Sequence, residues 1–307
     1  MSIPLLFAAA VQAGAPQQKT QAPGYYRMML GDYEITALSD GTVDLKPKEL
    51  LTNTTPAQVS GLLERSFAGE AVPTSVNAYL INTGDKLVLV DTGAAGLFGP
   101  TLGNLLANLA ASGYKPEQVD AVLITHMHSD HVGGLMNDGK MAFPNATVHA
   151  DQRDLDFWLS QSNLDKAPAT MKGVFQGAMA SMNPYVASSK VKAFSGSTDL
   201  FAGIRAVAAP GHTPGHTIYA IESKGEKLLL WGDLMHFAAV QFPEPQITIA
   251  FDTDSPAAAA QRIKAFADAA QGRYLVAGAH LPFPGIGRLR ADGKGYAWVP
   301  VDYNAIR

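Results

Sequence analysis

Potential metal ligands crowd into six consecutive residues of this sequence. An apolar run over residues 121–125 predicts a buried strand, and two histidines placed two residues apart at its end project to the same side. A fold tolerates so many nitrogen and oxygen donors in one place mainly when a cation compensates them. Gly133 and Gly134 then allow a tight turn. A metal site is therefore favoured over a solvated loop, with the donors His126, His128, Asp130 and His131.

The second half of the chain supplies three more candidate donors, each a weak signal alone: His212, Asp233 and His280. A weak internal parallel connects the halves. In each half one apolar strand ends in a carboxylate, Asp91 or Asp233, and another ends in a histidine, His126 or His280. Two similar sheet-and-helix halves would bring these strand ends to one edge. Because the sequence contains no cysteine, any metal must be held by His, Asp or Glu.

Short β-rich runs alternate with helical patterns, which predicts a layered α/β arrangement. Helices are expected over residues 102–111 and from Ser255, read as an N-cap before Pro256, to about residue 270. The expected strands cover residues 33–39, 76–83, 87–90, 121–125, 146–150, 204–208, 217–221, 228–231 and 274–277.

Composition limits the function classes. With 307 residues, 47% hydrophobic, the chain is long enough for a sizeable core. Charged residues make up 16% and the net charge is −4, so there is no basic field for nucleic acid or an anionic membrane. Residues 1–24 are interpreted as a signal and linker segment, which favours a periplasmic or secreted protein over a cytoplasmic one. Its apolar run is too short to cross a membrane.

The motifs resemble those of the metallo-β-lactamase-fold hydrolases. Residues 25–307 are most similar to the methyl parathion hydrolase group and its lactonase-like, dihydrocoumarin-hydrolysing relatives, including the stretches 22–27 and 91–100. The resemblance implies one domain over residues 25–307, folded as an αββα sandwich of the α/β class. It also implies a homodimer. Residues 151–200, rich in Trp, Phe and Met, are interpreted as an insertion that roofs the site.

The resemblance also implies how the donors are shared. One metal ion would be held by His126, His128 and His212, and the other by Asp130, His131 and His280. Asp233 would bridge the two ions. Zinc suits nitrogen and oxygen ligands best, with manganese, cobalt or iron as alternatives. Asp91 is read either as a carboxylate that orients a ligand imidazole or as a turn residue.

Two such ions would share a water, giving a metal-bridging hydroxide at neutral pH that attacks the substrate, while one ion polarises the substrate oxygen. Asp130 and Asp233 would hold this arrangement. By the resemblance, His236 stands where lactonases carry a tyrosine that contacts the substrate oxygen, although a residue pointing elsewhere is the alternative. Phe98, Trp158, Val174 and Phe175 match residues of an aromatic pocket wall, with ordinary core packing as the alternative.

The pocket departs from the organophosphate-hydrolysing pattern at Leu51, His236, Ile249 and Phe251, and residues 169–172 are one residue shorter. A bulky Phe251 leaves less room for a tetrahedral phosphate than for a flat lactone. The sequence therefore predicts a hydrolase of aryl esters or lactones, of the dihydrocoumarin type, with weaker phosphotriester hydrolysis. Three alternatives remain open: a methyl parathion-type organophosphate hydrolase, a mono-iron persulfide dioxygenase-like oxidoreductase, and a metal-stabilised binding protein.

Overall fold

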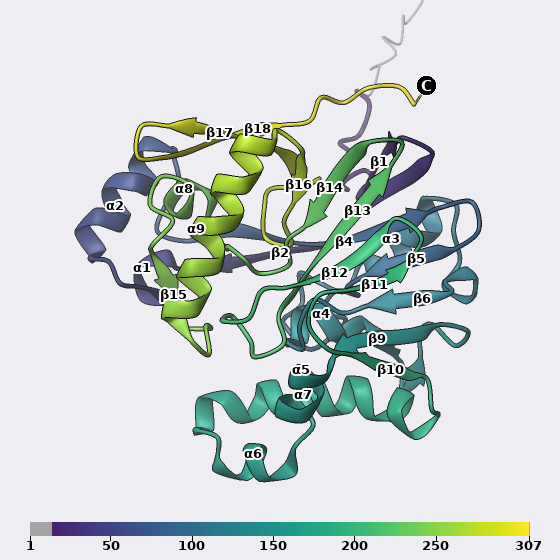
Figure 1. Ribbon diagram of the computed structural model, residues 1–307. Helices are drawn as coiled ribbons and strands as arrows, with labels where there is room; N and C mark the ends of the chain where they lie inside the picture. Colours follow the sequence, from purple (N-terminus) through teal and green to yellow (C-terminus); the bar gives the residue numbers. More distant parts are fainter. Residues whose placement is uncertain (1–13, 307) are drawn as a thin grey trace, which may run out of the picture.

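The computed structural model describes residues 14–306 and contains two seven-stranded sheets packed face to face (Figure 1). In sheet order, the first consists of β1 (Tyr25–Leu30), β2 (Tyr33–Leu45), β4 (Val72–Asn82), β5 (Leu87–Val90), β6 (Ala121–Leu123), β9 (Thr147–Asp151) and β10 (Val191–Phe194). The second consists of β11 (Thr198–Phe201), β12 (Ile204–Ala208), β13 (Thr217–Ser223), β14 (Glu226–Leu230), β16 (Leu275–Ala277), β17 (Ile286–Asp292) and β18 (Gly295–Pro300).

Helices cover the outer faces of the two sheets, and short elements fill the connections. The helices are α1 (Pro47–Leu50), α2 (Pro56–Arg65), α3 (Leu105–Ala111), α4 (Ser129–Val132), α5 (Gln152–Trp158), α6 (Gln161–Lys166), α7 (Ala169–Ala187), α8 (Ala238–Gln241) and α9 (Ser255–Gly272), with the 3-10 turns η1 (Pro116–Gln118) and η2 (Gly133–Leu135). Two small ribbons pair β3 (Leu51–Thr52) with β15 (Thr248–Ile249) and β7 (Met136–Asn137) with β8 (Lys140–Met141).

Three apolar layers hold the molecule together. One lies between the sheets and joins residues such as Ile35 and Val88 to Ile221 and Leu230. A second fills the outer face of the first sheet under α3 and α7, and a third lies between the second sheet and α9, around Phe266. Figure 1 shows α9 running across the second sheet, with α5, α6 and α7 grouped beside β9 and β10. The expected αββα sandwich is confirmed.

The internal parallel between the halves is also present in the sheets. Strand β5 pairs in parallel with β6, and β14 pairs in parallel with β16. The carboxyl ends of parallel strands meet at one edge of a sheet, so the segments that follow these four strands lie together. Those segments carry Asp91, His126, Asp233 and His280. The same edge of each half therefore supplies one carboxylate and one histidine.

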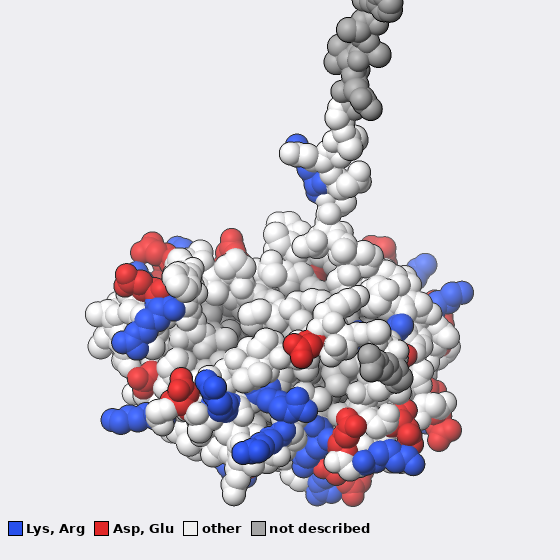
Figure 2. Space-filling model, turned by 90° about the horizontal axis from the view of Figure 1, so that it is seen from above, with Lys and Arg blue, Asp and Glu red and all other residues white. Residues whose placement is uncertain are grey.

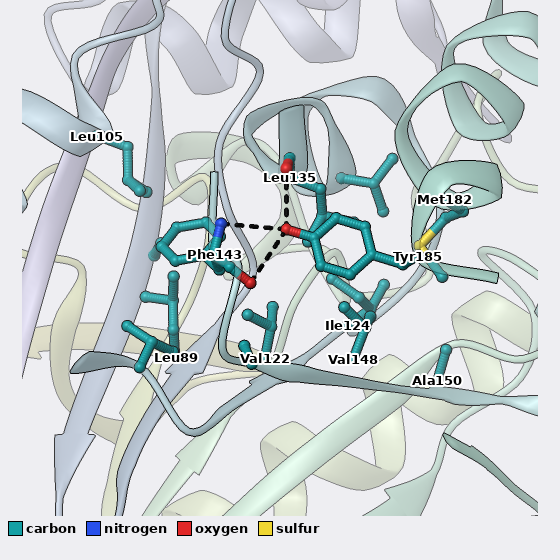
Figure 3. Packing of buried hydrophobic residues seen from close by; sticks show 14 of the residues in the cluster. Leu89, Leu105, Val122, Ile124, Leu135, Phe143, Val148, Ala150, Met182 and Tyr185 are labelled. Atoms are coloured by element: carbon teal, nitrogen blue, oxygen red, sulfur yellow. Dashed lines mark hydrogen bonds between the residues drawn. The ribbon is translucent and has the colours of Figure 1, made fainter. Parts of the chain in front are cut away.

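Helix α7 is fastened to the first sheet by a buried tyrosine (Figure 3). The Tyr185 hydroxyl donates to the Leu135 carbonyl at 3.1 Å and accepts from the Phe143 amide at 3.1 Å. Its ring packs in the cluster that includes Val148 and Met182. A buried hydroxyl with both partners satisfied fixes its helix without a desolvation penalty. This matters for the site because the first half of α7 forms one wall of it.

Several sequence-based boundaries need correction. The helix predicted from residue 102 begins at Leu105, and Ser255 is the first helical residue rather than the cap. Asp254 is the cap, because its carboxylate accepts from the Ala257 amide at 3.0 Å. The strands β1, β10, β11, β17 and β18 were not expected.

His149 on β9 should make stability depend on pH. Burial and the nearby Lys192 ammonium lower its pKa to about 4. Between the unfolded value near 6.5 and 4, only the unfolded chain takes up this proton as pH falls. The contribution of His149 to the free energy of unfolding is therefore fully present above about pH 6.5. It decreases as the pH falls towards 4, by at most about 1.4 kcal/mol per pH unit. In urea unfolding at pH 7, 6 and 5, a His149→Gln variant should lose stability less steeply than the unmodified protein. Parallel curves would contradict this.

Candidate metal centre

Short connections after the strands bring the predicted donors to one edge of the sandwich. Strand β6 ends at Leu123, and the chain then presents His126 and His128 before entering α4. Helix α4 carries Asp130 and His131. Gly133 and Gly134 permit a close approach rather than only a turn, because an added Cβ would lie 2.2 Å from the Ala94 carbonyl oxygen and 1.9 Å from that of Thr92. The donor loop is therefore pressed against the segment after β5.

The donors form two groups that meet at one carboxylate. In each group one ligand atom per residue lies within 4.8 Å of all the others: His126, His128, His212 and Asp233 in the first, and Asp130, His131 and His280 in the second. Asp233 Oδ2 lies 3.3 Å from His212 Nε2 and 3.5 Å from His126 Nε2. Its Oδ1 lies 3.1 Å from His131 Nε2 and 3.0 Å from His280 Nε2. All seven residues predicted as ligands are thus brought together, with Asp233 between the groups.

The polar atoms at the centre lack partners in a way that fits metal ions. Among residues 14–306, the buried atoms without a hydrogen-bond partner include His126 Nε2, His131 Nε2 and Asp233 Oδ1. In addition, His212 Nε2 and His128 Nδ1 face each other at 3.1 Å, a contact between two potential lone pairs. Unpaired buried groups are costly, and divalent ions would satisfy them. The donor set of imidazoles and carboxylates fits two such ions.

Four of the donor histidines have their other ring nitrogen held by a partner outside the centre. His131 Nδ1 lies 2.8 Å from the carboxylate of Asp91, which confirms that Asp91 orients a donor histidine. His212 Nδ1 contacts Asp252 at 2.9 Å. His280 Nδ1 donates to the Ser75 carbonyl at 2.8 Å, and His126 Nδ1 lies 3.1 Å from the Thr125 hydroxyl. These partners fix which ring nitrogen faces the centre.

Electrostatics at the cluster favour a cation. Burial by itself would lower the pKa of His131, but the neighbouring carboxylates, that of Asp233 first, raise it well above its ordinary value. Burial would raise the pKa of Asp233, but the surrounding imidazoles hold it well below the usual range. Burial lowers the pKa of His126. Asp233 therefore stays ionised while His126 keeps its lone pair, as metal ligands require.

Two positioning residues were not identified as such from the sequence. His216, which the sequence suggests is only structural, donates from Nδ1 to the Ala209 carbonyl and accepts from the Asp233 amide at Nε2, at 3.1 and 3.0 Å. Asp154 on α5 accepts from the Met127 amide at 3.2 Å and the Thr213 hydroxyl at 2.9 Å, and from the Gly215 amide. It thereby joins the loop of His126 and His128 to the loop of His212. A lone acidic residue on a short helix gave no signal for this.

Replacing Asp154 with asparagine should loosen both donor loops. Burial raises the pKa of Asp154 to about 6 despite its three donors. An asparagine would present an NH₂ group to donors that need an acceptor, which should cost about 2 kcal/mol of unfolding free energy. Zinc affinity should fall roughly tenfold to a hundredfold, measured by competition with a chelator. Asp156→Asn, on the exposed side of the same helix, is the control, and equal affinities in both variants would exclude this role.

A narrow cavity of about 100 Å³ opens onto the cluster. Of the residues predicted to line a pocket, Phe98, Val174, His236 and Phe251 do so. The cavity is also lined by four residues that were not predicted as pocket residues: Val43, Leu45, Ser129 and Met171.

The other four predicted pocket residues do not line the cavity. Trp158 and Phe175 are buried in the layer under α7, where their rings pack against each other at 4.7 Å. Leu51 and Ile249 pair across the β3–β15 ribbon and are buried in its small apolar cluster. They support the wall from behind. In the case of Trp158 the indole still lies edge-on against His128, at 5.2 Å.

This fold and donor set define a class of proteins. The chain matches the metallo-beta-lactamase superfamily over residues 71–280 and belongs to that superfamily; it is a metal-dependent hydrolase of this class. Among solved structures, the hydrolase AbOPH of the beta lactamase superfamily is 41% identical, with a TM-score of 0.88 over 93% of this chain and 100% of that one. AidC, a dizinc quorum-quenching lactonase in complex with the product N-hexanoyl-L-homoserine, is 28% identical, with a TM-score of 0.84 over 92% and 99%.

Two curated relatives match over smaller parts of this chain. An N-acyl homoserine lactonase from a Bacillus species is 23% identical over 215 residues, which cover 64% of this chain and 78% of the lactonase. Exodeoxyribonuclease WalJ of Streptococcus pneumoniae is 34% identical over 104 residues, so this chain spans only about a third of that protein, 35% of its length.

Proposed function

We propose that this protein is a two-zinc hydrolase of small neutral lactones and aryl esters, of which dihydrocoumarin is a representative. The observation that carries the proposal is the narrow apolar cavity whose floor is the donor cluster. Its floor is formed by His128, Asp130, Asp233, His236 and His280. The lactonases among the relatives support the same class of substrate.

The cavity selects against charged substrates. Its walls are apolar, from Val43 and Leu45 on one side to Met171 and Val174 of α7 on the other. Among the described residues that line it, none is Lys or Arg. A substrate carboxylate or phosphodiester would find no cationic side chain there. Figure 2 shows that charged side chains of both signs are spread around one face of the molecule, without a broad basic surface. Small neutral molecules therefore suit this site better than nucleic acid or a β-lactam carboxylate.

The chain's own residues prepare the reaction. When bound, two divalent ions supply an activated water and a Lewis acid for the substrate oxygen. Asp91 and Asp252 hold His131 and His212 in the orientation that presents Nε2 to the centre. Phe98 and Phe251 line the cavity, where they would pack against the aryl ring of a bound substrate. A phenolate leaves without needing a proton donor, and a water activated by the ions would take the place of a Ser-His-Asp relay.

Phe251 supports the ranking of lactones over phosphotriesters. Its ring lies 5.8 Å from that of His236, across the cavity floor. A flat bicyclic lactone packs beside these rings more readily than a tetrahedral dialkyl phosphate does. Phosphotriester hydrolysis is therefore proposed as a weaker side activity.

The test is a comparison of kcat/KM for dihydrocoumarin, an acyl homoserine lactone, methyl parathion and a cephalosporin with the zinc-loaded protein. Dihydrocoumarin should be hydrolysed fastest and the cephalosporin not at all. Methyl parathion as the best substrate would reverse the ranking and favour an organophosphate hydrolase. Absence of hydrolysis, together with a single iron ion found in the protein as purified, would favour the oxidoreductase.

Phe251→Leu should shift this selectivity. The smaller side chain widens the cavity, so the ratio of methyl parathion to dihydrocoumarin kcat/KM should rise roughly tenfold. Phe67→Leu is the control, since Phe67 is fully exposed. An unchanged ratio in Phe251→Leu would show that this ring does not limit the substrate.

Export and dimerisation stay predictions. The first thirteen residues of the expected signal segment lie outside the described residues. Residues 14–23 are exposed, and residues 14–24 contain no helix or strand. Within the described chain, no helix combines the length and hydropathy needed to cross a membrane.

A further inference from the structure

His236 is a buried histidine without a hydrogen-bonding role. Its side chain is only 2% exposed, and among the described residues neither Nδ1 nor Nε2 has a hydrogen-bond partner. A buried imidazole nitrogen without a hydrogen-bond partner is costly unless a cation satisfies its lone pair. The ring nitrogens of His126 and His131 that share this condition are those that face the metal centre. A metal ion beside His236 would satisfy its ring in the same way.

The position of His236 matches that explanation. Its Nε2 lies 3.1 Å from Asp233 Oδ2, and His280 Nε2 lies 3.1 Å from the same oxygen. The rings of His236 and His280 are stacked, with centroids 4.9 Å apart and planes at 19°. Ligand atoms of Asp233, His236 and His280 all lie within 4.8 Å of one another. Two imidazoles and a carboxylate therefore face one point.

The backbone of His236 is also fixed. The amides of His236 and Phe237 both donate to Gln241 Oε1, at 2.7 and 3.0 Å, and the Gln241 amide donates to the Ile247 carbonyl at 3.0 Å. This network holds the residue where α8 begins. A ligand held in place before metal binding loses little conformational entropy when the ion binds.

We propose that His236 is a further metal ligand, which joins His280 and Asp233 on the ion that His280 holds. This rests on the proposed two-zinc centre but not on any choice of substrate. The ion would then have one more protein donor than the seven-residue set provides. A zinc ion with five protein donors departs from the four-coordinate geometry typical of structural sites. The site would bind its metal more tightly and accept metals that prefer five or six ligands.

The direct test is a crystal structure of the full-length protein loaded with zinc. A His236 nitrogen about 2.0–2.1 Å from one ion is the expected result, because that is the ordinary zinc–imidazole distance. A separation above about 3 Å would overturn the proposal, since no coordinate bond has that length. This readout does not depend on turnover, so it distinguishes failure of this proposal from failure of the proposed hydrolase function.

A metal titration provides the second test. His236→Leu should weaken the binding of one of the two zinc equivalents by at least about tenfold, as measured by competition with a chelator. It should also change the visible absorption spectrum of the cobalt-loaded protein, because the coordination of one ion changes. Phe251→Leu, which alters the ring beside His236 but no donor, is the control. Unchanged affinity and an unchanged cobalt spectrum in His236→Leu would show that His236 is not a ligand.

Discussion

Replacing Asp233 with asparagine is expected to lower kcat/KM for dihydrocoumarin by roughly a thousandfold. The two carboxylate oxygens lie between the two groups of imidazoles: Oδ2 is 3.3 Å from His212 Nε2, Oδ1 is 3.1 Å from His131 Nε2, and His280 Nε2 is within 3.1 Å of both. An asparagine keeps the size but removes the charge and turns an NH₂ group towards one group. The ions would lose their common ligand, and steady-state kinetics with saturating zinc measure the loss.

Asp199→Asn is the matched control for this substitution. Asp199 is an exposed carboxylate on β11 that pairs with Arg205, outside the centre. Its replacement should leave kcat/KM within about twofold, because exposed ion pairs contribute little. If Asp233→Asn retained more than a tenth of the activity, a bridging role for Asp233 would be untenable.

Removal of the metal should have the second largest effect. Chelator-treated protein should lose hydrolysis, and its unfolding midpoint should fall by roughly 10 °C, since binding at a thousandfold excess over Kd contributes about 4 kcal/mol. The cause is the donor cluster itself, because without ions the carboxylates and imidazoles around Asp233 stay buried and uncompensated.

Differential scanning calorimetry before and after zinc addition measures this effect. Zinc should restore both the midpoint and the activity, whereas magnesium should restore neither, because it prefers oxygen ligands and retains its waters. A midpoint that did not change on metal removal would show that the cluster is stable without ions.

The metal cluster was predictable because its signals are local. His126 to His131 stand within six residues, and the strand ends before Asp233 and His280 repeat the pattern of the first half. Residue type and spacing therefore carry the chemistry. Most strands of the sheets could likewise be predicted from short apolar or alternating runs, although β17 and β18 were missed.

The pocket and the supporting residues were less predictable because they depend on tertiary packing. Nothing in the local sequence distinguishes Phe251, which faces the cavity, from Trp158, which packs behind the wall. Likewise, Asp154 meets the two donor loops only after α5 has packed beside β9 and β10. Residues of this kind come together through contacts distant in sequence, which spacing alone does not reveal.

Zinc titration of the metal-free protein, with dihydrocoumarin hydrolysis followed at each addition, tests the central claim most directly. We expect two zinc ions to bind per chain and hydrolysis to reach its maximum only when the second is bound. Full activity at a single metal equivalent, or activity independent of added metal, would contradict a two-metal hydrolytic centre.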